Sequence, residues 1–310
     1  MSSSVVRKPP SICVMLVHYN RLRETVDCIR SLKNCRYPSL RIQVVDNGST
    51  DNSLGLLRGE FKDVQIVSTG KNLGFTGASN FGFDLLKADP PEYLLLLNND
   101  TEVEPDFLAR LVDAAEADPE AGAFVGTVCY FDDKEEIWYG GGEFKFWRGS
   151  GFSRGQGLRF SDLRDGKNVE VSFATGCALL IRMRALERTG LFDDRFFLYL
   201  EDADLSLRLR AAGYRLVYVP SSRIYHKVHH AGDKSRPLYF STRNRLLILR
   251  LHFSGWRRIT GMTYVLLTTA LKAPGWWLRR KDLFWAGVYG VWDYFRGNLH
   301  QGRGLTLHMY

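Results

Sequence analysis

Short apolar runs alternate with amphipathic segments over the first 230 residues of the chain. The apolar runs are typical of strands buried on both faces, and the amphipathic segments are typical of helices that cover a sheet. The predicted strands are Ile12–Val17, Arg41–Val45, Val64–Val67, Tyr93–Leu97, Phe124–Tyr130, Phe173–Ile181 and Arg215–Val219. The predicted helices are Leu22–Leu32, Ser53–Arg58, Thr76–Lys87, Pro105–Ala117 and Asp202–Ala212. This alternation predicts an α/β fold with a mostly parallel central sheet and helices on both faces.

Two stretches depart from the alternation. Asp132–Asn168 is rich in glycine and aromatic residues, which predicts a long loop or hairpin over a site. From residue 233 onward the chain becomes basic and rich in tryptophan. We therefore predict two domains, an α/β domain at residues 1–232 and a helical extension at residues 233–310.

The net charge of +8 comes from this extension, where 13 Lys and Arg residues stand against three acidic residues. Five of the seven tryptophans also lie there. Basic clusters beside Trp-rich apolar segments are typical of amphipathic helices in a bilayer interface, so we expect an anionic membrane surface as a partner. A homo-oligomer contact is the alternative. The extension lacks the polar residues expected of a base reader, and we expect no nucleic acid partner.

No apolar run reaches the roughly 18 residues that a spanning helix needs. The longest candidate, Ile259–Leu271, lies between Arg258 and Lys272, and the run Ile12–Val17 is too short for a signal-peptide core. We therefore expect a cytoplasmic protein that lies peripherally on the inner face of the cell membrane.

Polar residues follow several predicted strands, where open α/β sheets bind ligands. The carboxylate of Asp46 can accept hydrogen bonds from a base or a ribose, although a simple Asx-turn explains it equally. The segment Asn72–Gly82 has three glycines whose backbone N–H groups can approach a pyrophosphate, although tight packing gives the same pattern. After Leu94–Leu97, the run Asn98-Asn99-Asp100 places a carboxylate at the rim of the sheet. It can hold a divalent cation or cap the following helix.

Three acids, Glu201, Asp202 and Asp204, open the last predicted helix of the α/β domain. They suit the helix dipole, but they also repel one another, which can raise the pKa of one of them for general-base chemistry. His226 follows the next strand, where it is either structural or a ligand.

Taken in order, these segments resemble family-2 glycosyltransferases with the GT-A (Rossmann-like) fold, particularly the rhamnosyltransferase-like bacterial subgroup. The resemblance covers roughly residues 10–250. It rests on VVDNGSTD, NLGFTGASNFG, LLLLNNDTEVEPDFL, ATGCALLIRM, GLFDDRFFLYLEDADLSLRLRAAGY, IYH and FSTRN.

The resemblance implies a nucleoside-diphosphate sugar donor, a divalent cation (Mn²⁺ or Mg²⁺) and inversion at the anomeric carbon. Asp46 matches the residue that holds the base, with Asn72, Gly74 and Asn99 beside the nucleotide. Asn98 departs from the family's DxD pattern, which leaves Asp100 as the expected metal ligand.

His226 matches a histidine that completes the metal or diphosphate site in similar enzymes. Asp202 looks like the catalytic base, with Glu201 and Asp204 as the other candidates. Arg243 either serves the diphosphate or packs against the sheet.

The subgroup favours transfer of L-rhamnose from dTDP-rhamnose to a glycan or polyprenyl-linked acceptor. A transferase that uses UDP-hexose or UDP-N-acetylhexosamine is an alternative. A sugar nucleotidyltransferase is disfavoured because His18–Arg21 replaces the expected Gly-rich basic loop. A sugar-binding scaffold on a degenerate transferase fold is the remaining alternative, which only Asn98 favours.

Overall fold

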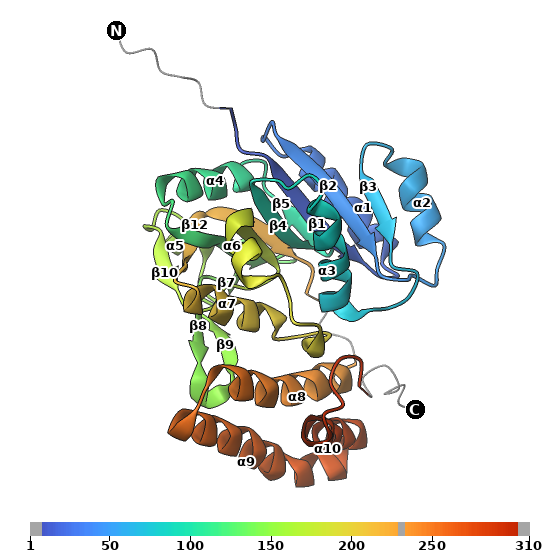
Figure 1. Cartoon of the computed structure of the whole chain (residues 1–310), viewed down its shortest axis with the longest axis vertical. Coiled ribbons are helices and arrows are strands. Elements are labelled where there is room, and N and C mark those ends of the chain that lie inside the picture. Colours follow the sequence, from blue (N-terminus) through green and yellow to red (C-terminus); the bar gives the residue numbers. More distant parts are fainter. Residues whose placement is uncertain (1–7, 229–232, 303–310) are drawn as a thin grey trace.

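The computed structural model describes residues 8–228 and 233–302. Within them, a ten-stranded sheet has the order β10-β12-β6-β11-β4-β1-β2-β3, with β5 paired to β12 and β7 paired to β6. Helices cover both faces of this sheet, and three C-terminal helices form a further layer at one end (Figure 1). The predicted α/β fold with a mostly parallel central sheet is therefore confirmed.

The strands are β1 (Ile12–His18), β2 (Leu40–Asp46), β3 (Gln65–Ser68), β4 (Tyr93–Asn98), β5 (Thr101–Val103), β6 (Ala121–Tyr130), β7 (Ile137–Tyr139), β8 (Gly142–Lys145), β9 (Ser150–Ser153), β10 (Val169–Val171), β11 (Ala178–Arg182) and β12 (Arg215–His226). The helices are α1 (Leu22–Lys33), α2 (Ser53–Glu60), α3 (Gly74–Leu86), α4 (Phe107–Ala117), α5 (Phe160–Leu163), α6 (Met183–Thr189), α7 (Glu201–Ala211), α8 (Ser235–His252), α9 (Gly255–Arg279) and α10 (Lys281–Arg296). Two 3₁₀ turns are η1 (Phe146–Arg148) and η2 (Asp194–Phe196).

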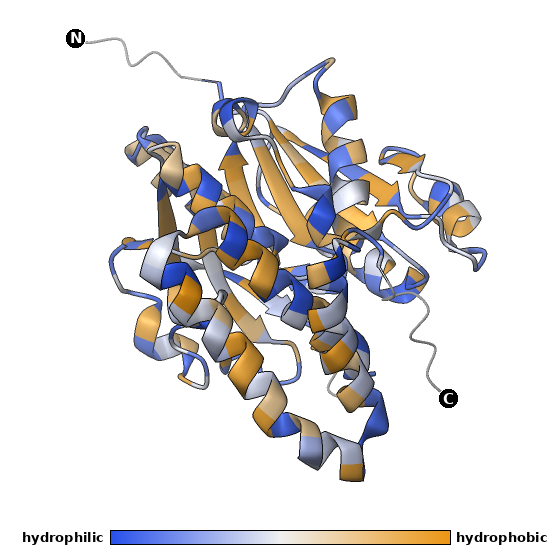
Figure 2. Cartoon of the chain, turned by 60° about the horizontal axis from the view of Figure 1, so that its bottom comes forward, coloured by the Kyte–Doolittle hydropathy of each residue, from blue (hydrophilic) through white to orange (hydrophobic). Residues whose placement is uncertain are grey.

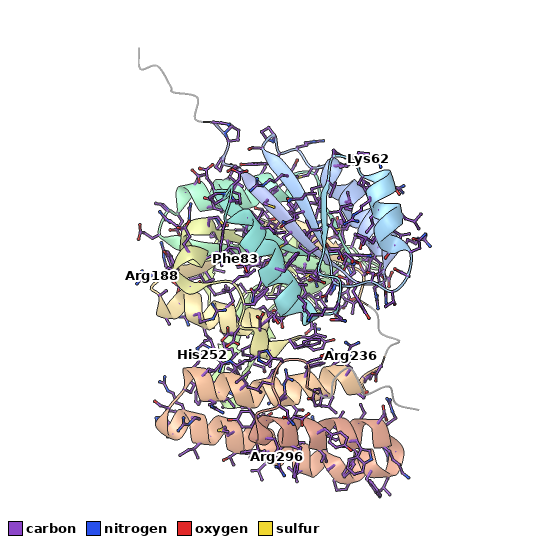
Figure 3. The ribbon with its side chains drawn as sticks, turned by 45° about the vertical axis from the view of Figure 1, so that its right-hand side comes forward. Lys62, Phe83, Arg188, Arg236, His252 and Arg296 are labelled. Carbon is purple, nitrogen blue, oxygen red and sulfur yellow. The ribbon has the colours of Figure 1, made fainter. Side chains whose placement is uncertain are left out.

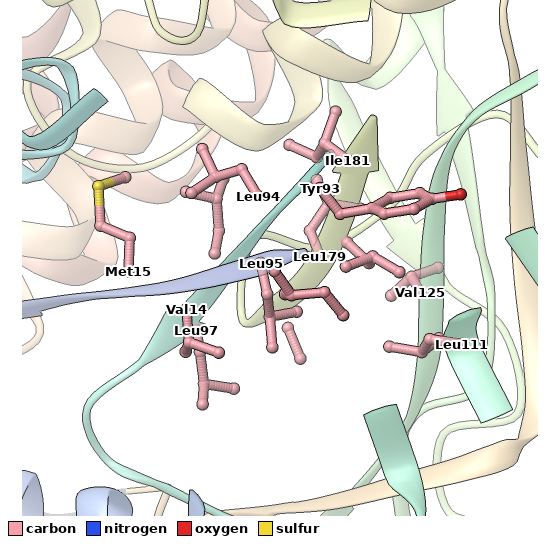
Figure 4. Packing of buried hydrophobic residues seen from close by; sticks show 14 of the residues in the cluster. Val14, Met15, Tyr93, Leu94, Leu95, Leu97, Leu111, Val125, Leu179 and Ile181 are labelled. Carbon is pink, nitrogen blue, oxygen red and sulfur yellow. The ribbon is translucent and has the colours of Figure 1, made fainter. Parts of the chain in front are cut away.

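Strands β4, β1, β2 and β3 run parallel, as do β6 and β12, and β11 lies antiparallel between β4 and β6. Leu94–Leu97 of β4 are almost fully buried at the centre of this arrangement. Figure 4 shows Leu94 and Leu95 near Leu179 and Ile181 of β11, and Leu97 near Val14 of β1. Apolar residues buried on both sides explain why this strand is a continuous run of leucines.

Two predicted strands differ from the observed ones. The strand predicted at Phe173–Ile181 begins only at Ala178, because residues 174–177 form a turn that contacts the start of α7. The strand predicted at Arg215–Val219 continues to His226 through an irregularity between Val219 and Arg223. Its extension carries His226 into the sheet, opposite Thr101 of β5.

The glycine-rich stretch Asp132–Asn168 contains the two-stranded sheet β8–β9. This hairpin reaches the C-terminal layer, where the rings of Phe144 and Phe253 stack with centroids 5.8 Å apart. Trp138, which precedes the hairpin, lies edge-on to the His226 ring at 4.9 Å. The stretch therefore forms a hairpin, and it touches both the strand-end region and the C-terminal helices.

Helix α8 is the innermost of the C-terminal helices, and its buried side chains include Tyr239, Phe240 and the run Leu246–Leu249. Helix α10 packs against α8, and α9 contacts both (Figure 1). Residue 232, the predicted end of the first domain, lies outside the described residues, and the division into two domains stays a prediction. None of the helices in the described ranges is long and apolar enough to cross a bilayer.

Candidate active site

A cavity of about 570 Å³ opens at the carboxyl ends of β1, β4 and β12. Its wall is formed by the turn after β1, the start of α3, the end of β4, and the segments that precede α7 and α8. Of the residues predicted from sequence, it is lined by Asn72, Gly74, Asn99, Asp100 and His226. The five residues come from three segments that are distant in the chain, and the sheet topology brings them together.

Asp100 and His226 meet because β5, directly after Asp100, pairs with the end of β12. The carboxylate Oδ1 of Asp100 lies 3.2 Å from Nε2 of His226. Burial raises the pKa of Asp100, but the imidazole beside it outweighs burial and lowers that pKa below its usual value. Among the described residues, Oδ1 of Asp100 and Nδ1 of His226 are buried without a hydrogen-bond partner. Such orphaned atoms indicate that a group from outside the chain completes this site.

A carboxylate and an imidazole suit Mn²⁺ or Mg²⁺, although the described residues contain no group of three or more His, Cys, Asp or Glu side chains placed for a metal. A cation held by a diphosphate needs only one or two protein ligands, since phosphate oxygens and water supply the rest. The residues present therefore fit a cation that binds together with a nucleotide.

Glu201 and Asp202 begin α7, directly after Tyr199 and Leu200. The two carboxylate oxygens of Asp202 accept hydrogen bonds from the backbone N–H groups of Gly176 (3.0 Å) and Ala203 (2.8 Å). Glu201 is buried, and its Oε2 has no partner among the described residues. Burial, followed by repulsion from Asp202, raises the pKa of Glu201 to about 8.

Burial also raises the pKa of Asp202, while the backbone N–H groups oppose that rise. Because two neighbouring buried carboxylates cannot readily both carry a negative charge, the raised pKa values favour one proton on the pair. Hydrogen bonds to its charged form favour Asp202 as the ionised partner, and Glu201 keeps the proton. Cys177 lies near both this pair and Asp100. Burial is the main cause that raises the pKa of its thiol, and the negative charges of Asp100 and Asp202 raise that pKa further.

Two of the nucleotide candidates, Asn72 and Gly74, form a cradle together with Asn47, and Asn99 lies apart from it. Oδ1 of Asn72 accepts hydrogen bonds from the Gly74 N–H (2.9 Å) and from the side-chain amide of Asn47 (3.2 Å). Gly74 has a positive φ of 77°, and a Cβ there would lie 2.5 Å from the carbonyl oxygen of Phe197. The side chain of Asn99 donates to Oγ1 of Thr25 at 2.8 Å.

Asp46, at the end of β2, does not line the cavity. Its carboxylate is buried and accepts hydrogen bonds from the Ser49 N–H (3.2 Å) and the Ser68 hydroxyl (2.7 Å). The bond to Ser49 joins residues three apart, so the carboxylate stabilises the turn after β2 but does not form an Asx-turn, which needs the N–H two residues on. The proposed contact of Asp46 with a base stays a prediction.

Asp204 and Arg243 lie outside the cavity. The Asp204 carboxylate is bound by Arg208 and His252, each at 2.7 Å, and so joins α7 to the end of α8. Arg243 is fully buried and donates to backbone carbonyls, including that of Phe196 at 2.8 Å. In this arrangement neither side chain faces the cavity.

Most of the other residues that line the cavity were not among the sequence candidates, and they include the polar side chains of Arg21, Tyr199, Lys227 and Arg236. Lys227 bonds to both Asp27 and Glu102 at 2.8 Å, whereas Nε of Arg236 is buried without a hydrogen-bond partner among the described residues. Arg236 begins α8, and Figure 3 shows it at the opposite end of that helix from His252. Only the basic character of the extension pointed toward Arg236, and no sequence pattern indicates that this residue faces the strand ends.

Solved structures share this architecture. A mannosyltransferase from Pyrobaculum calidifontis in complex with GDP-Man and Mn²⁺ superposes with a TM-score of 0.58 at 16% identity, covering 93% of this chain and 88% of that one. GalNAc-T7 with UDP, GalNAc and Mn²⁺ gives a TM-score of 0.63 at 18% identity, covering 78% of this chain and 49% of that one. The fold is therefore that of the GT-A glycosyltransferases.

The model of the family described as glycosyl transferase family 2 matches residues 13–190. An N-acetylglucosaminyl-diphospho-decaprenol L-rhamnosyltransferase of Mycobacterium tuberculosis is 30% identical over 238 residues, covering 70% of this chain and 76% of its own length. The rhamnosyltransferase WbbL of Escherichia coli is 31% identical over 144 residues, covering 45% of this chain and 53% of its own length. The chain belongs to glycosyl transferase family 2 and is rhamnosyltransferase-like, which confirms the resemblance drawn from its motifs.

Proposed function

We propose that the protein is an inverting glycosyltransferase that moves L-rhamnose from dTDP-rhamnose to a hydroxyl of a glycan or polyprenyl-linked acceptor. One observation carries this proposal: Asp100 and His226 line one cavity with Tyr199, and the carboxylate pair Glu201 and Asp202, which does not line the cavity itself, begins two residues after Tyr199 at the start of α7. The similarity to two rhamnosyltransferases supports rhamnose as the sugar. UDP-hexose and UDP-N-acetylhexosamine are the alternative donors.

The start of α3 and the ends of β2 and β4 would hold the nucleotide, with Asn72, Gly74 and Asn99 nearest to it. Asp100 and His226 would hold Mn²⁺ or Mg²⁺, which when bound stabilises the negative charge that develops on the leaving diphosphate. Arg236 lines the same cavity, and its buried Nε supports a second contact with the diphosphate.

Asp202 would act as the general base. As the acceptor oxygen attacks the anomeric carbon, its proton passes to Asp202 and the bond to the diphosphate oxygen breaks. This single displacement inverts the anomeric centre without a covalent intermediate. General-base catalysis of this kind contributes about 10²–10⁴ in rate. Glu201, with a pKa of about 8, would stay protonated at neutral pH and hold the negative charge on its neighbour.

The outer helices support a membrane surface as a partner. Leu267, Leu271 and Leu278 of α9 are exposed, Leu271 and Leu278 by 79% and 80%, and α10 exposes Trp285, Trp292 and Phe295. Figure 2 brings these helices forward and shows hydrophobic residues along both of them. Cations flank the exposed apolar positions: Arg257, Arg258, Lys272, Arg279, Arg280, Lys281 and Arg296. Apolar side chains with basic neighbours suit an anionic lipid surface, where a lipid-linked acceptor is also found.

Thermal unfolding with dTDP, UDP or GDP, with and without Mn²⁺, tests donor and metal together. A ligand at about 100 times its Kd adds about 2.7 kcal/mol to the folded state. We expect the largest Mn²⁺-dependent shift with dTDP, and a larger shift with UDP would redirect the sugar. Asp202→Asn should keep this shift and lose transfer to acceptor. If no nucleotide shifts the unfolding of the wild type, a degenerate scaffold is the better account.

Co-sedimentation with vesicles of phosphatidylcholine and phosphatidylglycerol tests the membrane surface. Replacing Leu271 and Leu278 with Glu should abolish binding at little cost in stability, because both side chains are already exposed. Leu56→Glu is the matched control, since Leu56 is 51% exposed on α2. Wild-type protein that stays in the supernatant with anionic vesicles would refute membrane binding, and a dimer in solution would then favour the oligomer contact.

A further inference from the structure

The segment between η2 and α7 has a backbone conformation that non-glycine residues rarely adopt. Phe197, Tyr199 and Leu200 have φ values of 61°, 67° and 68°. Each of these residues carries a Cβ that disfavours a positive φ, so the intrinsic backbone preferences of the segment oppose the conformation that it adopts. Something in the surrounding structure must hold residues 197–200, which we call the strained turn.

Two neighbouring residues of α8, Arg243 and Asn244, stabilise the strained turn through hydrogen bonds. The side-chain amide of Asn244 donates to the carbonyl oxygens of Phe196 (3.0 Å), Leu198 (2.9 Å) and Tyr199 (2.7 Å). Arg243 is fully buried beside it, and its Nε donates to Oδ1 of Asn244 at 2.9 Å, which fixes the orientation of the amide. Buried amide donors that face several carbonyls specify one backbone conformation rather than merely filling space.

Arg243 extends the same contact. Its Nη2 donates to the carbonyl oxygens of Arg195 (3.1 Å) and Phe196 (2.8 Å), and its Nη1 donates to that of His300 at 2.7 Å. The guanidinium therefore ties η2, which leads directly into the strained turn, to the segment that follows α10. An apolar side chain of similar volume would fill this space without orienting any carbonyl.

The strained turn in turn contacts the candidate site on two sides. A Cβ on Gly74 would lie 2.5 Å from both the ring and the carbonyl oxygen of Phe197. The Thr76 N–H donates to the same carbonyl oxygen at 3.3 Å. On the other side, Leu200 leads directly into Glu201 and Asp202. The direction of the strained turn thus sets both the wall of the nucleotide cradle and the start of the helix that presents the carboxylates.

We propose that Arg243 and Asn244 are positioning residues for glycosyl transfer, which act by holding the strained turn so that Asp202 faces the acceptor beside the bound donor. This inference rests on the proposed function for the role of Asp202. The FSTRN segment would then position the backbone before α7, a role that differs from both diphosphate contact and simple packing. The C-terminal layer thereby becomes part of the catalytic apparatus, although its helices do not supply a reacting group.

The test is Asn244→Asp, which keeps the size of the side chain but points acceptor oxygens at three carbonyls. We expect kcat to fall at least tenfold, the KM for the donor to change less than threefold, and the acidic limb of the kcat–pH profile to move. Asn244→Ser, which retains one donor, should restore part of kcat, and Arg243→Lys should resemble it. Leu249→Ala is the control, because Leu249 is a buried α8 residue that packs on Gly149 and Gly261 and has no side-chain donor for the carbonyls of the turn.

Hydrogen exchange measured by mass spectrometry gives a readout that needs no activity. Exchange in peptides that cover residues 74–78 and 198–206 should be faster in Asn244→Asp and unchanged in Leu249→Ala. An Asn244→Asp protein with wild-type kcat, pH profile and exchange would overturn the proposal even if its Tm were lower. A wild-type protein inactive with every donor would refute the proposed function, and the exchange data alone would then decide whether Asn244 holds the turn.

Discussion

Gly74→Ala is the substitution whose effect can be worked out most directly from the structure. The φ of 77° at Gly74 lies in the left-handed region, which costs an L-residue about 1–2 kcal/mol. The new Cβ would also lie 2.5 Å from the Phe197 carbonyl oxygen and ring, so backbone has to move, at a further cost of about 1–3 kcal/mol. The free energy of unfolding should therefore fall by about 2–5 kcal/mol.

Each kcal/mol moves the Tm of a domain of this size by about 2 °C, so Gly74→Ala should lower Tm by about 4–10 °C. Nucleotide binding should weaken as well, because the Gly74 N–H is held by Asn72 in the cradle. Calorimetric unfolding and titration with dTDP in Mn²⁺ measure the two effects.

Gly59→Ala is the matched control. Gly59 lies in α2 with no positive φ, and its added Cβ would meet no atom within 4 Å. Alanine in a helix is favoured over glycine by about 0.5–1 kcal/mol, so the same chemical change should leave Tm unchanged or raise it. Equal Tm values for the two variants would refute the close approach of Phe197 to Gly74.

Three further predictions follow from the charged groups. Burial raises the pKa of Glu201 to about 8 in the folded state, so folding takes up a proton and stability is lost as pH rises from about 4.5 through 8. Glu201→Gln should flatten this part of a curve of Tm against pH. An unchanged slope would show that another group titrates in this range. Asp100→Ala should remove the Mn²⁺ dependence of nucleotide-induced stabilisation while the metal-free protein still folds, and a retained Mn²⁺ effect would exclude Asp100 as the ligand. Asp204→Asn weakens the buried link to Arg208 and His252, and should lower stability by about 3 kcal/mol in urea unfolding with donor binding intact; a selective loss of transfer would instead make Asp204 a candidate base.

Periodicity and strand-end chemistry were enough to predict the parallel core of the sheet and part of the cavity wall. Asn72, Asn99 and Asp100 stand next to apolar runs, and the parallel arrangement of those runs requires their carboxyl ends to meet at one edge. His226 could be placed only by its resemblance to the family, because the continuation of β12 depends on pairing with β5 and β6, which local periodicity does not encode.

The strained turn could not be predicted from local sequence at all. Phe197, Tyr199 and Leu200 have side chains that favour ordinary backbone regions, and their conformation is imposed by donors about 45 residues further along the chain. Arg243 illustrates the same limit: its identity suggested a phosphate ligand or packing, and only its carbonyl partners show what it holds.

The order in which parts of the active site are synthesised has a consequence for biogenesis. A nascent chain that has emerged as far as residue 226 contains Asp46, Asp100, both carboxylates of α7 and His226, but it lacks Asn244. Until α8 emerges and docks, the strained turn has no external donor to hold it and should sample other conformations. The enzyme would thus be inert during most of its translation, and a fragment that stops before α8 would bind sugar nucleotide poorly and transfer nothing.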